Sequence, residues 1–157
     1  MAGAVIEGPE GVLLVANRRR NGAVDWSTPG GVVDPGETVL EGLTREVAEE
    51  TGLVVTAWEG PLYEIETVAP DLGWHLRVEV HRAIEVTGDL IVDDPDGIVV
   101  DACWVPGGEC APRLAASQQW VREPLSAWIG ERWTESRTYR YRLHGTDPAS
   151  FRVAVER

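Results

Sequence analysis

The chain has 157 residues, of which 43% are hydrophobic, and this size and composition fit one globular domain with its own core. Its 26 acidic and 14 basic residues give a net charge of −12, which repels polyanions and argues against binding along a nucleic acid polymer.

Only Cys103 and Cys110 are cysteines, which excludes a disulfide framework, and their spacing does not form a zinc site. No apolar run of about 18 residues is present, so we expect no membrane span. The first ten residues lack the basic region of a signal peptide, so we expect a cytoplasmic protein.

The first part of the chain predicts strands, a turn-rich segment and one helix. Strands are expected over residues 2–6 and 11–16, followed by a basic loop at 18–22 and a breaker-rich segment at 26–31. A further turn is expected at 34–36.

From Thr38 onward the pattern becomes helical, with an apolar stripe formed by Leu40, Leu43 and Val47. Thr38 and Glu41 have the spacing of a capping box, and Gly52 is placed to end the helix.

The second part of the chain predicts further strands and a second helix. Alternating β-branched residues predict strands over residues 53–57, 62–68 and 75–86, and an acidic turn at 93–97 precedes a strand over 98–105. A helix is expected over residues 112–132, with core positions at Trp120, Leu125 and Trp128. The order of these elements predicts an α/β or α+β fold with a mixed sheet.

The last residues predict a β-hairpin. Tyr139, Tyr141 and Leu143 alternate with polar residues, and the same rhythm returns after a turn at 145–149. We therefore divide the chain into a main domain over residues 1–135 and a hairpin extension of the same domain over 136–157. The apolar faces of the hairpin must be covered, either by the core of the same chain or by a second subunit in a homodimer, and we favour the homodimer.

Three carboxylates of the first helix carry the strongest chemical signal. Glu46, Glu49 and Glu50 fall within an arc of roughly 100° on a helix, and three anions so close repel one another unless a cation lies between them. Ligand sets made only of oxygen select hard ions such as Mg²⁺ or Mn²⁺. Arg45 points to another side of the helix and could reach back to Glu37, which would clamp the loop before the helix.

The glycines before the helix complete the pattern. Gly30 and Gly31 allow a backbone carbonyl to approach a metal ion closely. Each of these features alone is common, since acidic helix faces are usually solvated and paired glycines usually mark turns. Their joint spacing is what indicates a functional site.

The segment from Gly31 to Leu53 resembles the box motif of the Nudix hydrolases at every position. The matching residues are Gly31, Glu37, Arg45, Glu46, Val47, Glu49, Glu50, Gly52 and Leu53. The resemblance extends over roughly residues 3–131 and implies an α/β/α sandwich around a mixed sheet. It also implies that Glu46, Glu49 and Glu50 bind divalent ions with the Gly30 carbonyl, while Arg45 and Glu37 hold the loop.

The resemblance implies hydrolysis of a phosphoanhydride bond in a nucleoside diphosphate linked to another group. Glu46 is our first candidate for the general base, and family members also recruit an acidic residue from a later loop. The candidates for that residue are Asp93, Asp94, Asp96 and Asp101. The alternative is a Nudix-fold module that binds a nucleotide without cutting it, although such modules tend to lose the box carboxylates.

The substrate remains open between an ADP-ribose-like nucleotide sugar and a (deoxy)nucleoside triphosphate. Pro70 lies near the position where relatives that cleave ADP-ribose carry a proline, and the lack of a tyrosine nearby disfavours dinucleoside polyphosphates. Arginines 18–20 could contact phosphates, and Trp26 or Trp74 could stack on a base.

Overall fold

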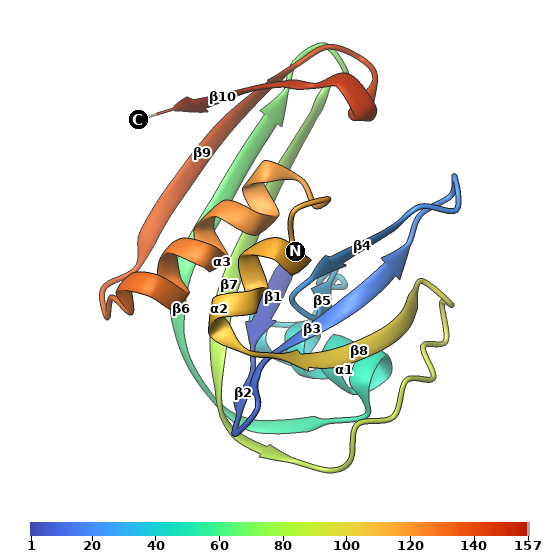
Figure 1. Cartoon of the computed structure of the whole chain (residues 1–157), viewed down its shortest axis with the longest axis vertical. Helices are drawn as coiled ribbons and strands as arrows, with labels where there is room; N and C mark the ends of the chain where they lie inside the picture. Colours follow the sequence, from blue (N-terminus) through green and yellow to red (C-terminus); the bar gives the residue numbers. More distant parts are fainter. Residues whose placement is uncertain (157) are drawn as a thin grey trace.

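Two β-sheets form the centre of the structure, a computed structural model that describes residues 1–156 (Figure 1). In spatial order, the large sheet contains β10 (Arg152–Glu156), β9 (Arg137–His144), β6 (Val54–Ala69), β7 (Trp74–Thr87), β1 (Ala2–Val5) and β5 (Gly30–Gly31). The small sheet contains β2 (Glu7–Gly8), β3 (Gly11–Arg18), β4 (Val24–Ser27) and β8 (Val99–Val105). β1 pairs with β7 and β6 with β9 in parallel, whereas the other pairs are antiparallel. The mixed α+β class predicted from the sequence is confirmed, with the strands divided between two sheets.

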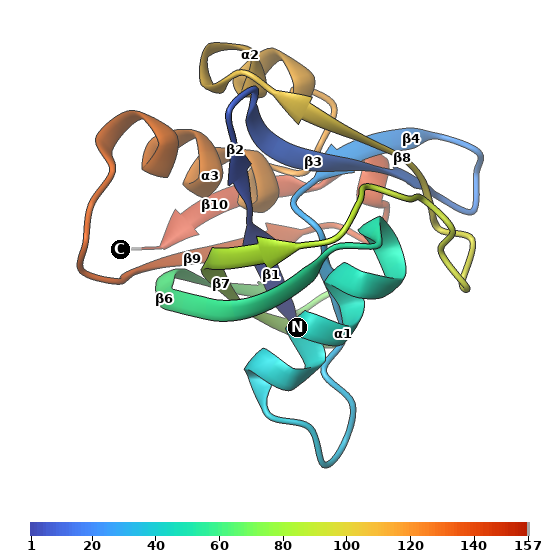
Figure 2. The same ribbon diagram turned by 90° about the horizontal axis from the view of Figure 1, so that it is seen from below.

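The helices lie on two sides of the strands. Figure 2 shows α1 (Val39–Thr51) on one side and α2 (Gly107–Arg113) and α3 (Gln119–Glu131) on the other. A short 3-10 helix, η1 (Pro148–Ser150), lies between β9 and β10. Among residues 1–156, no helix is long and apolar enough to cross a membrane.

Each helical side has its own hydrophobic core. Between the large sheet and α3, the buried side chains include Tyr63, Tyr141 and the three predicted core residues of α3, which are Trp120, Leu125 and Trp128. Beneath α1, Leu43 and Val47 pack against β1 and β3. Leu40 is 38% exposed, so its predicted place in the apolar stripe is wrong, and the partly buried Val39 packs at that end of the helix instead. These contacts fix α1 against β1, which pairs with β5, the strand formed by Gly30 and Gly31.

The predicted strands 53–57 and 62–68 are one long strand, β6. Its pairing with β7 shifts register at three points between Val55 and Tyr63, and the last shift contains Gly60 and Pro61. Glycine and proline inside a strand pattern often mark such irregularities, which explains why the sequence suggested a break. The strand bends at this point and continues.

The predicted helix over residues 112–132 is two helices. α2 begins at Gly107 and ends one residue after Pro112, and α3 begins at Gln119. Between them the Ser117 hydroxyl donates a hydrogen bond to the Trp26 carbonyl, which fixes the connection to β4. The two glycines at the start of α2 concealed the first helix, because glycine has low helix propensity.

The C-terminal ribbon continues the large sheet. β9 lies parallel to β6, and its Tyr141 and Leu143 side chains are fully buried in the core that contains α3. The apolar face of β9 is therefore covered by the same chain. β10 pairs antiparallel with β9, and its Val155 remains 50% exposed.

Candidate functional site

The helix with the three candidate carboxylates is fixed at both ends. The Thr38 hydroxyl accepts from the Glu41 N–H at 3.1 Å, and the Glu41 carboxylate accepts from the Thr38 N–H at 3.2 Å, which confirms the capping box. Gly52 ends the helix in the left-handed conformation at φ 77°, as predicted. The caps set where the helix begins and ends, and so fix which turn presents the carboxylates.

Arg45 holds the loop before the helix. Its Nε and Nη2 donate to the two carboxylate oxygens of Glu37 at 2.9 Å each, so the expected contact is present. Nη2 also donates to the Val32 carbonyl at 3.0 Å, and Glu37 accepts from the Asp34 N–H at 2.9 Å. These hydrogen bonds, those from Arg45 above all, lower the pKa of Glu37 to about 2.

Arg45 also contacts two of the box carboxylates, which the sequence analysis did not anticipate. Its Nη1 lies 3.1 Å from Glu46 and 3.3 Å from Glu49, and Nη2 lies 3.3 Å from Asp34. The long side chain can leave the helix on one side and still place its guanidinium across the next turn. The contact between Arg45 and Asp34 was also not predicted from the sequence. Asp34 lies three residues before Glu37 in the same turn, and this spacing could have indicated the contact.

Glu50 is the most buried carboxylate of the site. It is 6% exposed, and burial together with the charge of Glu46 raises its pKa to about 8. A single backbone N–H, that of Gly30, donates to it at 3.4 Å. Burial also raises the pKa of Glu46. Burial therefore disfavours the charged form of both carboxyl groups.

Gly30 and Gly31 let the helix carboxylates lie against the strand. A Cβ atom on Gly31 would stand 2.5 Å from the Glu46 carboxyl carbon, and a Cβ on Gly30 would stand 2.1 Å from the Ala2 carbonyl oxygen. The absence of a side chain is thus a steric requirement at Gly30, where a Cβ would meet backbone atoms. The free space beside Gly31 is occupied by the Glu46 carboxylate.

The chemistry of the donors fits a hard divalent cation. Glu46, Glu49 and Glu50 repel one another, and Glu50 is buried with one long hydrogen bond, which is a charge distribution that a cation relieves. Within residues 1–156, no three acidic, histidine or cysteine side chains already converge closely enough to hold an ion. Glu46 and Glu49 both contact the guanidinium of Arg45 instead.

Two of the four candidate aspartates act on the site. Burial is the largest cause of the raised pKa of Glu50 and of Glu46. The negative charge of Asp94 adds to the shift at Glu50, and that of Asp96 adds to the shift at Glu46. Asp94 also accepts from the backbone N–H groups of Ile98 and Val99 at 3.0 and 2.9 Å, so it organises its own loop.

The other two candidate aspartates have different surroundings. Asp101 accepts from the neighbouring Ala102 N–H, and Asp93 is exposed. The structure therefore distinguishes Asp94 and Asp96 from the remaining candidates.

The residues considered for substrate contacts have different surroundings. In the basic loop, Arg19 pairs with Asp25 at 2.7 Å, whereas Arg18 and Arg20 are exposed and have no acidic partner within the described part of the chain. The Arg113 guanidinium lies 4.7 Å from the centre of the Trp26 ring, so one face of that ring is already covered.

Two further candidates lie at the tip formed by β6 and β7. Trp74 is 36% exposed there. Pro70 belongs to the turn that joins these strands, whose Asp71 accepts from the Gly145 N–H at 2.8 Å.

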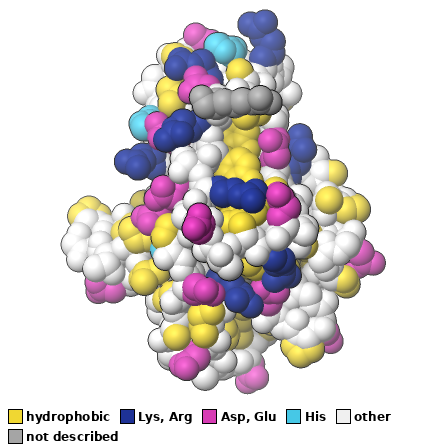
Figure 3. All heavy atoms as spheres, turned by 90° about the vertical axis from the view of Figure 1, so that its left-hand side faces the viewer, with side chains coloured by type: hydrophobic (Ala, Val, Ile, Leu, Met, Phe, Trp, Pro, Cys, Tyr) yellow, Lys and Arg dark blue, Asp and Glu magenta, His cyan; other side chains and the backbone are white. Residues whose placement is uncertain are grey.

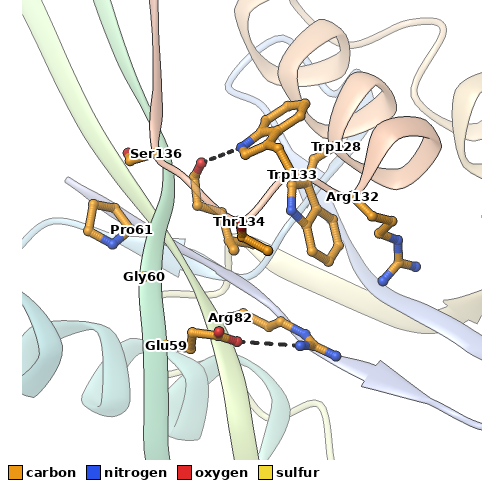
Figure 4. Close-up of a pocket in the computed structure, with 10 residues that line it drawn as sticks. Glu59, Gly60, Pro61, Arg82, Trp128, Arg132, Trp133, Thr134 and Ser136 are labelled. Atoms are coloured by element: carbon orange, nitrogen blue, oxygen red, sulfur yellow. Dashed lines mark hydrogen bonds and ion pairs between the residues drawn. The ribbon is translucent and has the colours of Figure 1, made fainter.

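A cavity of about 470 Å³ lies on the other side of the large sheet from α1 (Figure 4). Its walls include Trp128, Arg132 and Trp133 from α3 and the residues after it, and Arg82 from β7. Arg82 and Arg132 both bond to Glu7, and Arg82 also pairs with Glu59. Because its arginines are already paired, this cavity offers no surplus positive charge to a phosphate group.

Comparison with known proteins places the chain in a family. Residues 1–129 match the NUDIX domain. The chain is 32% identical over 125 residues to the mutator protein MutT4 of Mycobacterium tuberculosis, a match that covers 74% of this chain and 49% of MutT4. Phosphatase NudJ of Escherichia coli is 34% identical over 122 residues, which cover 75% of this chain and 72% of NudJ.

A solved structure agrees with these matches. The mutator MutT protein from Bacillus halodurans has a TM-score of 0.65 and 25% identity, with 97% of this chain and 95% of that chain covered. The chain spans about half the length of MutT4. Because the NUDIX match extends over most of the chain and includes every box residue, the chain belongs to the Nudix family.

Proposed function

We propose that the protein is a divalent-metal-dependent hydrolase of a phosphoanhydride bond in a nucleoside diphosphate linked to another group. The observation that carries the proposal is the set of box carboxylates on α1, with Glu50 buried beside Gly30 and Glu46 against Gly31. Modules that only bind nucleotides tend to lose box carboxylates, and this chain keeps all of them.

The metal ion, Mg²⁺ or Mn²⁺, would be held by Glu46, Glu49, Glu50 and the Gly30 carbonyl. When bound, such an ion neutralises phosphate oxygens and stabilises the leaving phosphate. Arg45 and Glu37 position the carboxylates, because Arg45 contacts Glu37, Glu46 and Glu49 at the same time. The Glu46 carboxylate is the proposed base that takes the proton from the attacking water, and its raised pKa favours that role.

For the substrate we propose a nucleoside triphosphate or an ADP-ribose-like nucleotide sugar. Both classes carry anionic phosphates, which the net charge of −12 repels unless bound cations or placed arginines supply local positive charge. The exposed Arg18 and Arg20 are the cations proposed to meet substrate phosphates.

The test is a panel of nucleoside triphosphates, nucleotide sugars and dinucleoside polyphosphates, each assayed for hydrolysis products with Mg²⁺ or Mn²⁺. We expect turnover of at least one class with metal and none in the presence of a chelator. The Glu50→Gln variant should be inactive on the same substrate, and Glu10→Gln, which changes an exposed carboxylate of a distant turn, should match the unmodified protein. Binding of a nucleotide without product in any assay would favour the non-catalytic module.

A further inference from the structure

The last strand of the described chain is an open edge. β10 forms one border of the large sheet and, among the described residues, pairs only with β9, in a regular register from Arg152 to Glu156 (Figure 1). An edge strand leaves one row of backbone N–H and carbonyl groups available for another strand.

The sequence of β10 does nothing to block this edge. Soluble proteins protect exposed edges with proline, with lysine, with a bulge or with a charge in the middle of the strand. β10 reads Arg-Val-Ala-Val-Glu, and its pairing with β9 contains no register shift. Its three central residues are small or β-branched and uncharged, which suits strand pairing.

The same five residues are complementary to themselves. In an antiparallel pair of two β10 strands centred on Ala154, Val153 stands opposite Val155 of the second copy, and Arg152 stands opposite Glu156 of the second copy. The two-fold axis repeats both pairs, so one register makes two pairs of opposite charge and two apolar pairs. A shift of this register in either direction separates the charges.

Arg152 has no acidic partner among the described residues of its own chain. Its neighbour on β9 is His144, and no ion pair of Arg152 occurs within residues 1–156. Glu156 is four residues away along the strand, roughly 13 Å at about 3.3 Å per residue, which is too far for a contact. Glu156 pairs with Arg142 at 2.6 Å through Oε1 and can still accept from a second cation.

Exposed apolar side chains accompany the edge. Val155, which is 50% exposed, stands opposite the buried Tyr141 of β9. On the side of the molecule where the chain ends, Figure 3 shows a narrow band of hydrophobic side chains bordered by charged ones. A second strand beside β10 would bring Val153 of that strand against Val155.

We propose that β10 pairs antiparallel with β10 of a second copy of this chain, in the register centred on Ala154. The two large sheets then join into one continuous sheet across a two-fold axis. The contact is short, whereas lasting interfaces bury about 1,000 Å² or more. The dissociation constant of the dimer is therefore expected to be micromolar or higher. The proposal is independent of the hydrolase activity, because the box lies on α1 and not on this ribbon.

Charge reversal provides the test. Sedimentation of the full chain from about 1 to about 500 µM should show a concentration-dependent dimer. Arg152→Glu places two acidic groups opposite each other at both ends of the pair, and Glu156→Arg places two arginines there. Each variant alone should dimerise at least about tenfold more weakly, whereas an equimolar mixture should recover dimers, because both cross-strand pairs then have opposite charges.

Controls separate this register from other causes. Arg18→Glu makes the same charge change at an exposed site in the small sheet and should leave dimerisation unchanged. Circular dichroism checks that each variant folds. For the unmodified chain, hydrogen exchange at residues 153–155 should slow as the protein concentration rises. A protein that stays monomeric to about 500 µM, an affinity unaffected by Arg152→Glu, or a mixture of variants that stays monomeric would each overturn the proposal.

Discussion

Arg45 and Glu37 form a two-point ion pair, in which both oxygens of one carboxylate accept from one guanidinium at 2.9 Å. The same guanidinium contacts Glu46 and Glu49, so the loop before α1 and the carboxylates on it share one positive charge. Fork-shaped pairing of this kind fixes orientation as well as distance. A change at Arg45 therefore affects the loop and the proposed metal site together.

Replacing Arg45 by alanine should lower both the melting temperature and the activity. Glu37 would lose its two strongest hydrogen bonds, and Glu46 and Glu49 would lose the charge between them. We expect activity to fall by about tenfold or more, because the carboxylates are no longer held in place. Arg45→Lys should recover part of the stability, since lysine can make one contact but not the fork.

Thermal scans and product assays of both variants measure these effects. An activity loss with an unchanged melting temperature would contradict the positioning role and would indicate that Arg45 contacts the substrate directly.

Replacing Glu50 by glutamine should separate metal binding from folding. The substitution replaces a buried carboxyl group, whose ionisation is disfavoured by burial, with a neutral side chain of similar size, so the metal-free protein should be as stable as before or more stable. It also removes a proposed ligand, so activity should fall on the order of 100-fold and the rise in melting temperature with added Mg²⁺ should disappear. Thermal scans with and without Mg²⁺ measure both effects, with Glu10→Gln as the matched surface control. Equal turnover by mutant and unmodified protein at saturating Mg²⁺ would refute the assignment.

The two aspartates of the loop before β8 should have different effects. Asp94→Ala removes the acceptor for the N–H groups of Ile98 and Val99, which should cost about 1 kcal/mol or more in the free energy of unfolding. Asp96→Asn should leave stability unchanged and raise the Mg²⁺ concentration needed for half-maximal activity a few-fold, because one negative charge near Glu46 is lost. Urea titrations and Mg²⁺ titrations of activity distinguish the two. Identical effects of both substitutions would show that the loop acts only as a unit.

The sequence predicted the parts of the site that depend on helix periodicity and failed where contacts arise from the folded chain. The caps at Thr38 and Gly52 and the shared face of the box glutamates follow from local spacing. The reach of Arg45 to Glu46 and Glu49 depends on its rotamer, which spacing alone does not fix. The proximity of Asp94 and Asp96 to the box is set by the path of the chain before β8.

Two features of the fold were not predicted from the sequence, for a similar reason. β5 contains only Gly30 and Gly31, and its strand conformation comes from pairing with β1 rather than from intrinsic preference. The continuity of β6 through Gly60 and Pro61 is imposed by its neighbours β7 and β9.

His81 should make the protein less stable in mild acid. It is 6% exposed, and burial lowers its pKa, although the nearby Glu79 and Glu64 act in the opposite direction. As the pH falls, the unfolded chain therefore takes up a proton near the ordinary pKa of about 6.5, before the folded protein does. Its contribution to stability is complete above that pH and is lost as the pH falls toward the pKa of the folded state.

The measurement is the urea midpoint at about pH 7.5 and about pH 5.5. The His81→Gln variant should lose less stability between these two conditions than the unmodified protein. A steeper loss in His81→Gln would mean that the ring is charged and paired with Glu79 in the folded protein.

Alanine at the two adjacent glycines should separate folding from chemistry. At Gly30, φ is 156° and the new Cβ would meet the Ala2 backbone at 2.1 Å, so the strand pairing between β5 and β1 must give way. We expect a lower melting temperature and, as a consequence, lower activity.

At Gly31 the new Cβ would meet only the end of the Glu46 side chain, at 2.5 to 2.8 Å, and a flexible side chain can rotate away. The melting temperature should then change little, while the displaced Glu46 carboxylate should reduce turnover by about tenfold or more. Thermal scans and kcat measured side by side test the contrast, and full activity in Gly31→Ala would exclude Glu46 as the base.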